Sequence, residues 1–278
     1  MTDRRLVAAN GRVAAIGLAG QGKADKYVTG WPMSVCRPVV DLRRAPDGAR
    51  DRQVLLGACV TVFEDREGWS FVQIANGYVG YIRSADLGAF QDATHFVGTM
   101  ATHAYSSDDF RSEPRHGLPF GARVRVVDER RHFYETTVGF IPKKHLRGLD
   151  RPYQDPINVA QLHFGVPYLW GGNSVRGIDC SGLVQVAHLA CGITCPGDSD
   201  QQELTFGWYL DDAEELRRGD IVFWKGHVAL VVENDTIIHA NAHHMAVAYE
   251  SLEQAIRRIE AQGDGLVTAR KRLQRKEG

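Results

Sequence analysis

The sequence predicts an α+β protein in which two small all-β barrels precede a domain of helices and antiparallel strands. Three observations support this fold class. Short runs of β-branched and aromatic residues, separated by turn residues, fill the chain between residues 39 and 149. Two stretches of that region resemble each other, which indicates two similar barrels. After residue 150 the pattern changes to helix signals followed by strand-like runs, the order expected of an α+β domain.

The composition is that of an ordinary globular protein with more than one domain. The chain has 278 residues, of which 44% are hydrophobic and 24% are charged, and its formal net charge is -1. No long run of one charge sign occurs, so we expect neither nucleic acid nor a membrane surface as a partner. No stretch approaches the roughly 20 apolar residues that a membrane span needs. The composition indicates no particular oligomeric state.

Residues 1–30 are interpreted as an N-terminal arm, either poorly ordered or packed on the rest of the chain. Arg4 and Arg5 precede an apolar stretch, as in a secretory signal, but Asn10 and Arg12 interrupt it. No continuous apolar segment of roughly 7–15 residues is left. The five cysteines are an odd number without a disulfide-framework spacing, which is typical of a reducing compartment. We therefore expect a cytoplasmic protein.

The two predicted barrels are supported by an internal repeat. Residues 57–62 resemble residues 121–126, and residues 79–82 match residues 138–141. In both copies a leucine follows five residues after the isoleucine. Two copies are too few for a solenoid, so two similar small barrels are predicted. The predicted boundaries are residues 31–90 for the first barrel, 94–149 for the second barrel and 150–278 for the last domain.

In the last domain, two helices are expected to precede three antiparallel strands. Asp155 is a suitable N-cap and Pro156 fits the first helical turn, so the first helix begins there and ends near Gly165. The second helix carries apolar residues on one face and is followed by a glycine. The remaining predicted elements are the second helix over residues 180–191 and the strands over residues 221–224, 227–232 and 236–240.

Cys180 lies where a loop enters the second predicted helix. A thiol in the first helical turn lies at the positive end of the helix dipole, which favours the thiolate. We therefore expect its pKa to fall below the ordinary value of about 8.5. The backbone N–H groups of that turn lack intrahelical partners and could hold a developing oxyanion. Cys180 is thus a candidate nucleophile that needs a base.

His227 and His239 are the candidates for activating Cys180. If Val232 pairs with Thr236 across the turn, His227 and His239 become diagonal neighbours on one face of the sheet. Such neighbours lie about 7–8 Å apart at the backbone, within reach of two imidazole rings. His239 would fix the tautomer of His227, and the other ring nitrogen of His227 would face the thiol. A strand-borne base opposite a helix-borne thiol is the arrangement of papain-type cysteine enzymes.

The other cysteines are interpreted as structural residues, and no cofactor is expected. Free cysteines are more often buried small hydrophobic residues than nucleophiles. Cys191 and Cys195 lie near His188, but their spacing fits no common zinc pattern. We therefore expect no metal site.

The candidate nucleophile and base each lie in a recognisable sequence block. The blocks are GVPYLWGGN at residues 165–173 with GIDCSGLV at 177–184, and RGDIVFW at 218–224 with GHVALV at 226–231. In this order they closely resemble the NlpC family of bacterial cell-wall peptidases, over about residues 150–278. The resemblance implies a papain-like cysteine peptidase domain. It also implies that Cys180 is the nucleophile, His227 the base and His239 the group that orients the base.

The front half resembles a subgroup of that family in which two bacterial SH3-like barrels precede the peptidase domain. Members are γ-D-glutamyl-L-diamino-acid endopeptidases, so the resemblance implies murein-derived peptides such as L-Ala-γ-D-Glu-diaminopimelate as partners. It further implies that an acid and a tyrosine of the first barrel hold the free amino end of the substrate. Tyr78 matches that tyrosine, and Asp51 stands where the family usually has glutamate. The candidate substrate-binding residues are Asp51, Tyr78, Tyr168, Asp179, Ser181, Asp198 and Ser199.

Two other functions fit the same residues. An amidase or an acyltransferase could use the same Cys–His pair, because a covalent acyl-thiol intermediate is common to all three activities. The second alternative is a binding module, in which the barrels tether an inactive domain to wall peptides. Retention of all three polar residues, Cys180, His227 and His239, argues against the second alternative.

Overall fold

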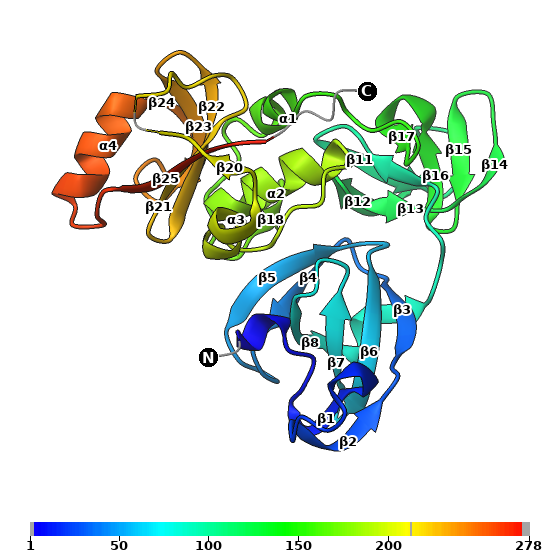
Figure 1. Ribbon diagram of the computed structural model, residues 1–278. Coiled ribbons are helices and arrows are strands. Elements are labelled where there is room, and N and C mark those ends of the chain that lie inside the picture. The colour runs from blue at the N-terminus through cyan, green and yellow to red at the C-terminus, as the bar shows by residue number, and fades with distance from the viewer. Residues whose placement is uncertain (1–2, 212, 274–278) are drawn as a thin grey trace. The chain divides into compact units, whose positions relative to one another are not determined.

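A computed structural model gives the structure of this chain and describes residues 3–211 and 213–273 (Figure 1). The chain divides into two compact units, Met1–Arg151 and Pro152–Gly278. The first unit is built from strands and short 3₁₀ turns, and the second combines four helices with a six-stranded sheet. The chain is therefore an α+β protein, as predicted. Among the described residues, no helix is both long and apolar enough to cross a membrane.

The N-terminal arm packs against the first barrel. It contains two short parallel strands, β1 (Gly11–Ala15) and β2 (Ala24–Val28). Burial of apolar side chains and an ion pair between Arg12 and Glu64, with 2.6 Å between Nη2 and Oε2, hold it in place. Of the two states considered for the arm, the structure thus has the packed one. The shared apolar cluster consists of Ala8, Val13, Phe63, Phe71 and Val79.

The first barrel is one seven-stranded antiparallel sheet whose strand order is β5-β4-β8-β7-β6-β3-β9. Alternate residues of its strands point inward, as in β4, where Val40 and Leu42 are buried. The period-two pattern in the sequence therefore becomes the barrel core. The strands are β3 (Trp31–Val35), β4 (Val39–Arg43), β5 (Arg50–Leu55), β6 (Cys59–Arg66), β7 (Trp69–Ile74), β8 (Val79–Arg83) and β9 (Leu87–Ala89).

The second barrel repeats the plan of the first. Its strands form two sheets, with orders β12-β11-β16-β15-β14 and β13-β10-β17. In both barrels a strand, a 3₁₀ turn and a short strand follow one another, as the repeat in the sequence suggests. Leu56 lies in the core of the second barrel, which links the two barrels within one unit. The strands are β10 (His95–Val97), β11 (Ala101–Tyr105), β12 (Pro114–Pro119), β13 (Arg123–Val124), β14 (Val126–Glu129), β15 (Phe133–Thr136), β16 (Gly139–Pro142) and β17 (Leu146–Gly148).

The second unit is a six-stranded antiparallel sheet with the order β20-β25-β21-β22-β23-β24. Helix α4 packs on one side of the sheet, and α1, α2 and α3 lie on the other side (Figure 1). The strands are β20 (Trp208–Tyr209), β21 (Ile221–Trp224), β22 (His227–Glu233), β23 (Thr236–Asn241), β24 (Ala246–Ser251) and β25 (Val267–Arg272), with a separate pair β18 (Asn173–Ser174) and β19 (Gly177–Ile178). The helices are α1 (Pro156–Leu162), α2 (Cys180–Ala190), α3 (Ser199–Thr205) and α4 (Leu252–Ala261).

Candidate active site

Asp179 fixes the start of α2 and with it the position of Cys180. It is the N-cap residue, and its Oδ1 accepts hydrogen bonds from the backbone N–H of Gly182 at 2.6 Å and from Ser181 Oγ at 3.0 Å. Its other oxygen, Oδ2, accepts from the backbone N–H of Gly171 at 2.9 Å. Asp179 and Ser181 are both buried, so the structure places these two candidates beneath the nucleophile as supporting residues.

The first turn of α2 lies against the loop that precedes it. A Cβ atom on Gly182 would come within 2.6 Å of the carbonyl oxygen of Gly172, which is backbone and has little room to move. Glycine at position 182 therefore permits the close approach that brings the Gly171–Asp179 hydrogen bond into reach.

Cys180 is 6% exposed, and its Sγ lies 4.0 Å from the carbonyl oxygen of Gly226. Burial and the charge of Asp179 raise its pKa to about 12, although the backbone N–H groups of Val228, Ser181 and Cys180 act in the opposite direction. The expected lowering of this pKa is therefore wrong for the resting site. Desolvation of the thiolate outweighs the stabilisation of its charge by these backbone N–H groups.

His227 and His239 meet as predicted. His227 Nε2 lies 2.9 Å from His239 Nδ1. The register agrees with the expected one at the pairs Leu230–Ile238 and Val231–Ile237. At the turn itself, a bulge pairs Thr236 with Glu233, so the predicted pairing of Thr236 with Val232 is wrong. The irregularity stays near the turn and leaves the two histidines in contact.

Two residues that the sequence interpretation missed extend this contact. Glu250 on β24 lies 3.0 Å from His239 Nε2 through its Oε2. Arg258 on α4 donates to both oxygens of Glu250, from Nε at 2.9 Å and from Nη2 at 2.8 Å. Extending the sheet to a strand over residues 246–251 would have exposed the signal, because the register brings Glu250 opposite Ile237, two residues from His239.

The charges of the active-site side chains depend on their burial. Burial, together with the nearby His239 and Arg258, lowers the pKa of His227 to about 3. The pKa of His239 is lowered by burial as well, although Glu250 acts in the opposite direction. Burial alone would raise the pKa of Glu250, but hydrogen bonds from His239 and Arg258 lower it far more. The resting site thus holds a neutral thiol, two neutral imidazoles and an ionised carboxylate.

Two further candidate segments lie near the thiol. Tyr168 is held by backbone bonding to Met245 and by a bridge to Ile178, and burial and the charges of Cys180 and Asp179 raise its pKa. Asp198 is the N-cap of α3 and Ser199 is its first residue. The Gln202 side chain on α3 donates to the carbonyl oxygen of Ser181 at 3.0 Å, which ties α3 to the start of α2. The structure therefore brings these candidates to the same end of α2.

Asp51 and Tyr78 lie in the first unit. The Asp51 side chain is 5% exposed, and Arg4 and Arg44 each form an ion pair with it, at 2.9 and 3.2 Å. Tyr78 is 2% exposed and belongs to the apolar core of the first barrel. An incoming ammonium group would have to compete with two guanidinium groups for Asp51.

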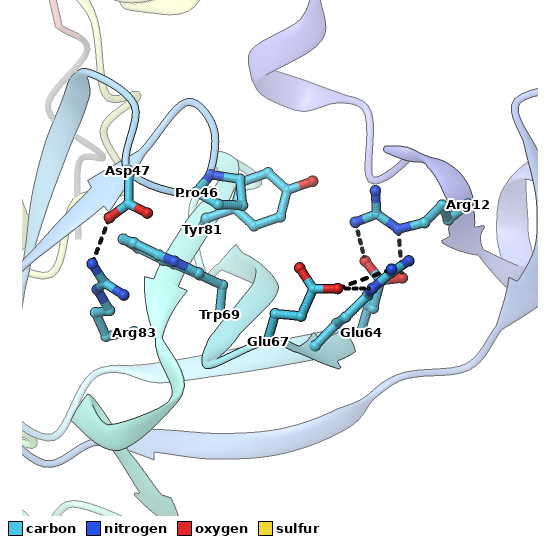
Figure 2. Close-up of a pocket in the computed structure, with 9 residues that line it drawn as sticks. Arg12, Pro46, Asp47, Glu64, Glu67, Trp69, Tyr81 and Arg83 are labelled. Carbon is cyan, nitrogen blue, oxygen red and sulfur yellow. Dashed lines mark hydrogen bonds and ion pairs between the residues drawn. The ribbon is translucent and has the colours of Figure 1, made fainter.

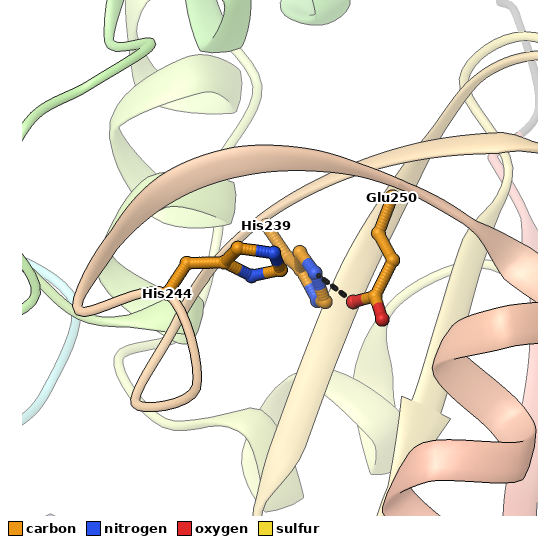
Figure 3. Close-up of side chains that lie close together, drawn as sticks. All are labelled: His239, His244 and Glu250. Atoms are coloured by element: carbon orange, nitrogen blue, oxygen red, sulfur yellow. Dashed lines mark hydrogen bonds and ion pairs between the residues drawn. The ribbon is translucent and has the colours of Figure 1, made fainter.

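His239, His244 and Glu250 lie close enough to suggest a cation site. One ligand atom of each lies within 4.8 Å of the others, and Figure 3 shows His239 between the other two side chains. However, Arg258 occupies both oxygens of Glu250, and His239 is in contact with one of them. We therefore interpret His239 and Glu250 as a hydrogen-bonded pair rather than as metal ligands, while His244 is bonded to Asn241.

A cavity of about 330 Å³ lies in the first unit, where the arm meets the first barrel (Figure 2). Its walls include Trp69 and Tyr81, and Arg83 stacks on Trp69 with 3.9 Å between its Cζ and the ring centroid. The arginines around it are paired with carboxylates, so the cavity presents no uncompensated charge to a ligand. The three pairs are Arg12–Glu64, Arg66–Glu67 and Arg83–Asp47.

A helix-borne cysteine beside a strand-borne pair of histidines defines a papain-like cysteine peptidase. The comparisons with known proteins agree. A profile of the NlpC/P60 family matches residues 165–260, and one described as "Bacterial dipeptidyl-peptidase Sh3 domain" matches residues 42–87. The chain belongs to the NlpC/P60 family and is a cysteine peptidase of that family.

Relatives from two Bacillus species are similar over most of their length. The chain is 33% identical to a gamma-D-glutamyl-L-lysine dipeptidyl-peptidase of Bacillus subtilis (strain 168), over 76% of this chain and 78% of the relative. It is 26% identical to a protein of the same name from Bacillus cereus (strain ATCC 10987 / NRS 248), over 68% of this chain and 67% of the relative. The crystal structure of an NlpC/P60 family protein from Bacillus cereus ATCC 10987 shares the fold, with a TM-score of 0.73 and 20% identity over 87% of this chain and 99% of that chain.

Proposed function

We propose that this chain hydrolyses the γ-D-glutamyl–diamino acid bond of murein-derived peptides that carry a free N-terminal L-Ala. The observation that carries the proposal is the continuous contact of His227, His239 and Glu250 beside the buried thiol of Cys180. The similar proteins named gamma-D-glutamyl-L-lysine dipeptidyl-peptidase support the choice of bond. A dipeptidyl-peptidase releases two residues from an amino end, which supports the requirement for a free amine.

The reaction begins with proton transfer from Cys180 to His227. Burial disfavours the thiolate and the imidazolium when either forms alone, so the two ions form together and stabilise each other. The sulfur then attacks the γ-carbonyl carbon of D-Glu, and the carbonyl electron pair moves to oxygen. In the first turn of α2 the N–H of Gly182 is already bound to Asp179. The backbone N–H groups of Cys180 and Ser181 are therefore the donors proposed for this oxyanion.

Two steps complete the turnover. The tetrahedral intermediate collapses, the carbon–nitrogen bond breaks, and the amine of the diamino acid leaves with the proton from His227. Water then attacks the thioester carbonyl and gives its proton to His227. The dipeptide leaves, and the proton returns to the sulfur of Cys180.

The roles of Asp51 and Tyr78 belong to the amine requirement. A carboxylate supplies the charge opposite to an ammonium group, and a phenol supplies a hydrogen bond. Because Asp51 is bound by Arg4 and Arg44 in the free protein, the substrate amine has to displace at least one of these guanidinium groups. The proposed contact therefore has a competitor within the chain itself.

The experiment is product analysis by mass spectrometry with L-Ala-γ-D-Glu-meso-diaminopimelate, free and N-acetylated. We expect free diaminopimelate from the first peptide and a loss of kcat/KM of more than about a hundredfold for the second, because the ionic contact is lost. Asp51→Ala and Tyr78→Phe should reduce this preference. Equal cleavage of the acetylated peptide would refute the amine requirement, and cleavage at another bond would refute the proposed activity.

We also propose the cytoplasm as the site of this reaction, where such tripeptides would be recycled. The odd number of cysteines supports a reducing compartment. Fractionation of the producing cell with an antibody to the chain tests this assignment. Recovery of the protein only from the cell envelope or the medium would contradict it.

A further inference from the structure

Glu250 is fixed in a single geometry by its neighbours. It lies on β24 opposite Ile237, while His239 pairs with Ala248, so Glu250 and His239 are diagonal neighbours on one face of the sheet. Its side chain is 9% exposed, and Arg258 binds both of its oxygens. Bidentate binding of this kind sets the orientation of the carboxylate as well as its charge.

The direction of the hydrogen bonds follows from the chemistry of Glu250. An ionised carboxylate can only accept, so the hydrogen between Glu250 and His239 is carried by Nε2 of His239. A neutral imidazole has one protonated nitrogen, which leaves Nδ1 of His239 as an acceptor. The contact of 2.9 Å to His227 is then a hydrogen bond donated by His227 Nε2. Nδ1 of His227 is left unprotonated.

We propose that Glu250, held by Arg258, is a positioning residue that sets the tautomers of both histidines and so leaves Nδ1 of His227 as the base for Cys180. Glu250 touches neither the substrate nor the thiol and acts through His239. Only the expected effect of Glu250 on turnover rests on the proposed function. The tautomers themselves are a property of the protein without substrate.

The opposite arrangement shows why the acceptor matters. If Nδ1 of His239 carried the hydrogen, it would donate to Nε2 of His227. Neutral His227 would then carry its own hydrogen on Nδ1, which could not take the proton of Cys180. The acceptor Glu250, which acts on Cys180 only through His239 and His227, thus decides whether the site has a base.

Arg258 has a separate effect on the charge near the nucleophile. Its charge balances that of Glu250, so the carboxylate supplies an acceptor without adding net negative charge beside the nucleophile. The exposed pair Glu253–Arg257 on the same helix has the same composition but lies 66% and 76% exposed and contacts no histidine in the described residues. It provides a matched control.

The test compares Glu250→Leu, Glu250→Gln and the control Glu253→Leu in the full chain. Leucine removes the acceptor at similar volume, whereas glutamine keeps one oxygen for His239 and loses the bond to Nε of Arg258. Nitrogen-15 NMR of the histidine rings reports the tautomers of His227 and His239 directly, without substrate. Thermal melting shows whether each variant is folded.

We expect the Nε2–H tautomer for both histidines in the wild type, in Glu250→Gln and in Glu253→Leu. Glu250→Leu should lose it, and its kcat should fall by about a hundredfold or more with little change in KM, since misorienting the base of a catalytic triad can cost about 10⁴-fold. Glu250→Gln should stay within about tenfold of the wild type, the equivalent of one hydrogen bond.

Unchanged tautomers in folded Glu250→Leu, or a kcat within about threefold of the wild type, would overturn the proposal. An Nδ1–H tautomer of His227 in the wild type would overturn it as well. If the wild type cleaves no γ-D-glutamyl peptide while Glu250→Leu still changes the tautomers, the proposed function fails and the inference about Glu250 stands.

Discussion

At the scale of single residues, Cys180 is buried and His227 is partly buried, and desolvation makes each of them unstable as an ion on its own. Burial raises the pKa of the thiol to about 12 and lowers that of the imidazole to about 3. The pair therefore shares one proton over a wide pH range, and its titration belongs to the pair rather than to either residue.

This sharing predicts how activity depends on pH. A second proton would bind to His227 only in strong acid, so kcat/KM should stay constant from pH 7 down to about pH 5. Steady-state kinetics over this range test the prediction, and the range avoids titration of the substrate amine near pH 8. A loss of activity centred near pH 6.5, the ordinary value for histidine, would show that His227 titrates freely and would contradict the burial argument.

Single residues also show what the sequence could and could not predict. Cys180, His227 and His239 were found because each lies in a motif or at a register position that needs only local pairing. Glu250 was missed because its role depends on a third strand, and Arg258 because it depends on the helix after that strand. The wrong direction for the thiol pKa arose because burial is a property of the folded chain and not of the helix start alone.

At the scale of elements, the start of α2 combines a helix cap with the nucleophile. Asp179 stabilises the helix through Gly182 and the preceding loop through Gly171, but its charge opposes the thiolate. Asp179 therefore increases the stability of the fold and decreases the reactivity of the thiol.

Substituting Asp179→Asn tests this opposition. Removing the charge should lower the pKa of Cys180 and speed its alkylation by iodoacetamide about three- to tenfold, the effect of roughly half to one pKa unit. The melting temperature should fall, because an amide nitrogen cannot accept from Gly171. Asp155→Asn, at the N-cap of α1, is the control that changes a cap without changing alkylation. An unchanged or slower reaction in Asp179→Asn would contradict the electrostatic argument.

Gly182→Ala tests the close approach of α2 to its preceding loop. The added Cβ would overlap the carbonyl oxygen of Gly172, so we expect a loss of about 1–3 kcal/mol in the free energy of unfolding together with lower kcat. Gly117→Ala on β12 is the control, because nothing lies within 4 Å of a Cβ atom there. Equal stability of the two variants in chemical denaturation would show that the loop gives way at little cost.

The six-stranded sheet of the second unit shows which strands could be predicted from the sequence and which could not. Strand β21 has the predicted bounds, and β22 and β23 differ from prediction by one residue at one end. The bulge near Thr236 was not predictable, since it depends on the geometry of the turn, where Asn234 has a positive φ of 43°. Strand β24, helix α4 and strand β25 were not predicted at all.

At the scale of the whole molecule, the chain forms two units, and the arm is part of the first. The repeat and the change of pattern after residue 150 predicted the barrels and the last domain. The packing of the arm was not decided by its sequence, because its apolar residues are few and find their partners on β6, β7 and β8.

Val13→Asp should loosen the first barrel. Val13 is 8% exposed in the apolar cluster that joins the arm to the barrel, and an unpaired carboxylate there should cost about 2–4 kcal/mol. Arg12→Ala, which breaks an exposed ion pair next to it, should cost less than about 1 kcal/mol. Hydrogen exchange in β6–β8 measures both effects. Similar protection in the two variants would mean that the arm does not stabilise the barrel.

The central claim is that Cys180 carries the substrate as a γ-D-glutamyl thioester. Acid quenching during turnover of L-Ala-γ-D-Glu-meso-diaminopimelate, followed by intact-protein and peptide mass spectrometry, measures this intermediate directly. We expect a mass increase equal to one L-alanyl-γ-D-glutamyl group, located on the peptide that contains Cys180 and absent in Cys180→Ala. Slower formation is expected in His239→Ala, because its base is misplaced while the thiol remains. Turnover by Cys180→Ala, or an adduct on any other residue, would contradict the account.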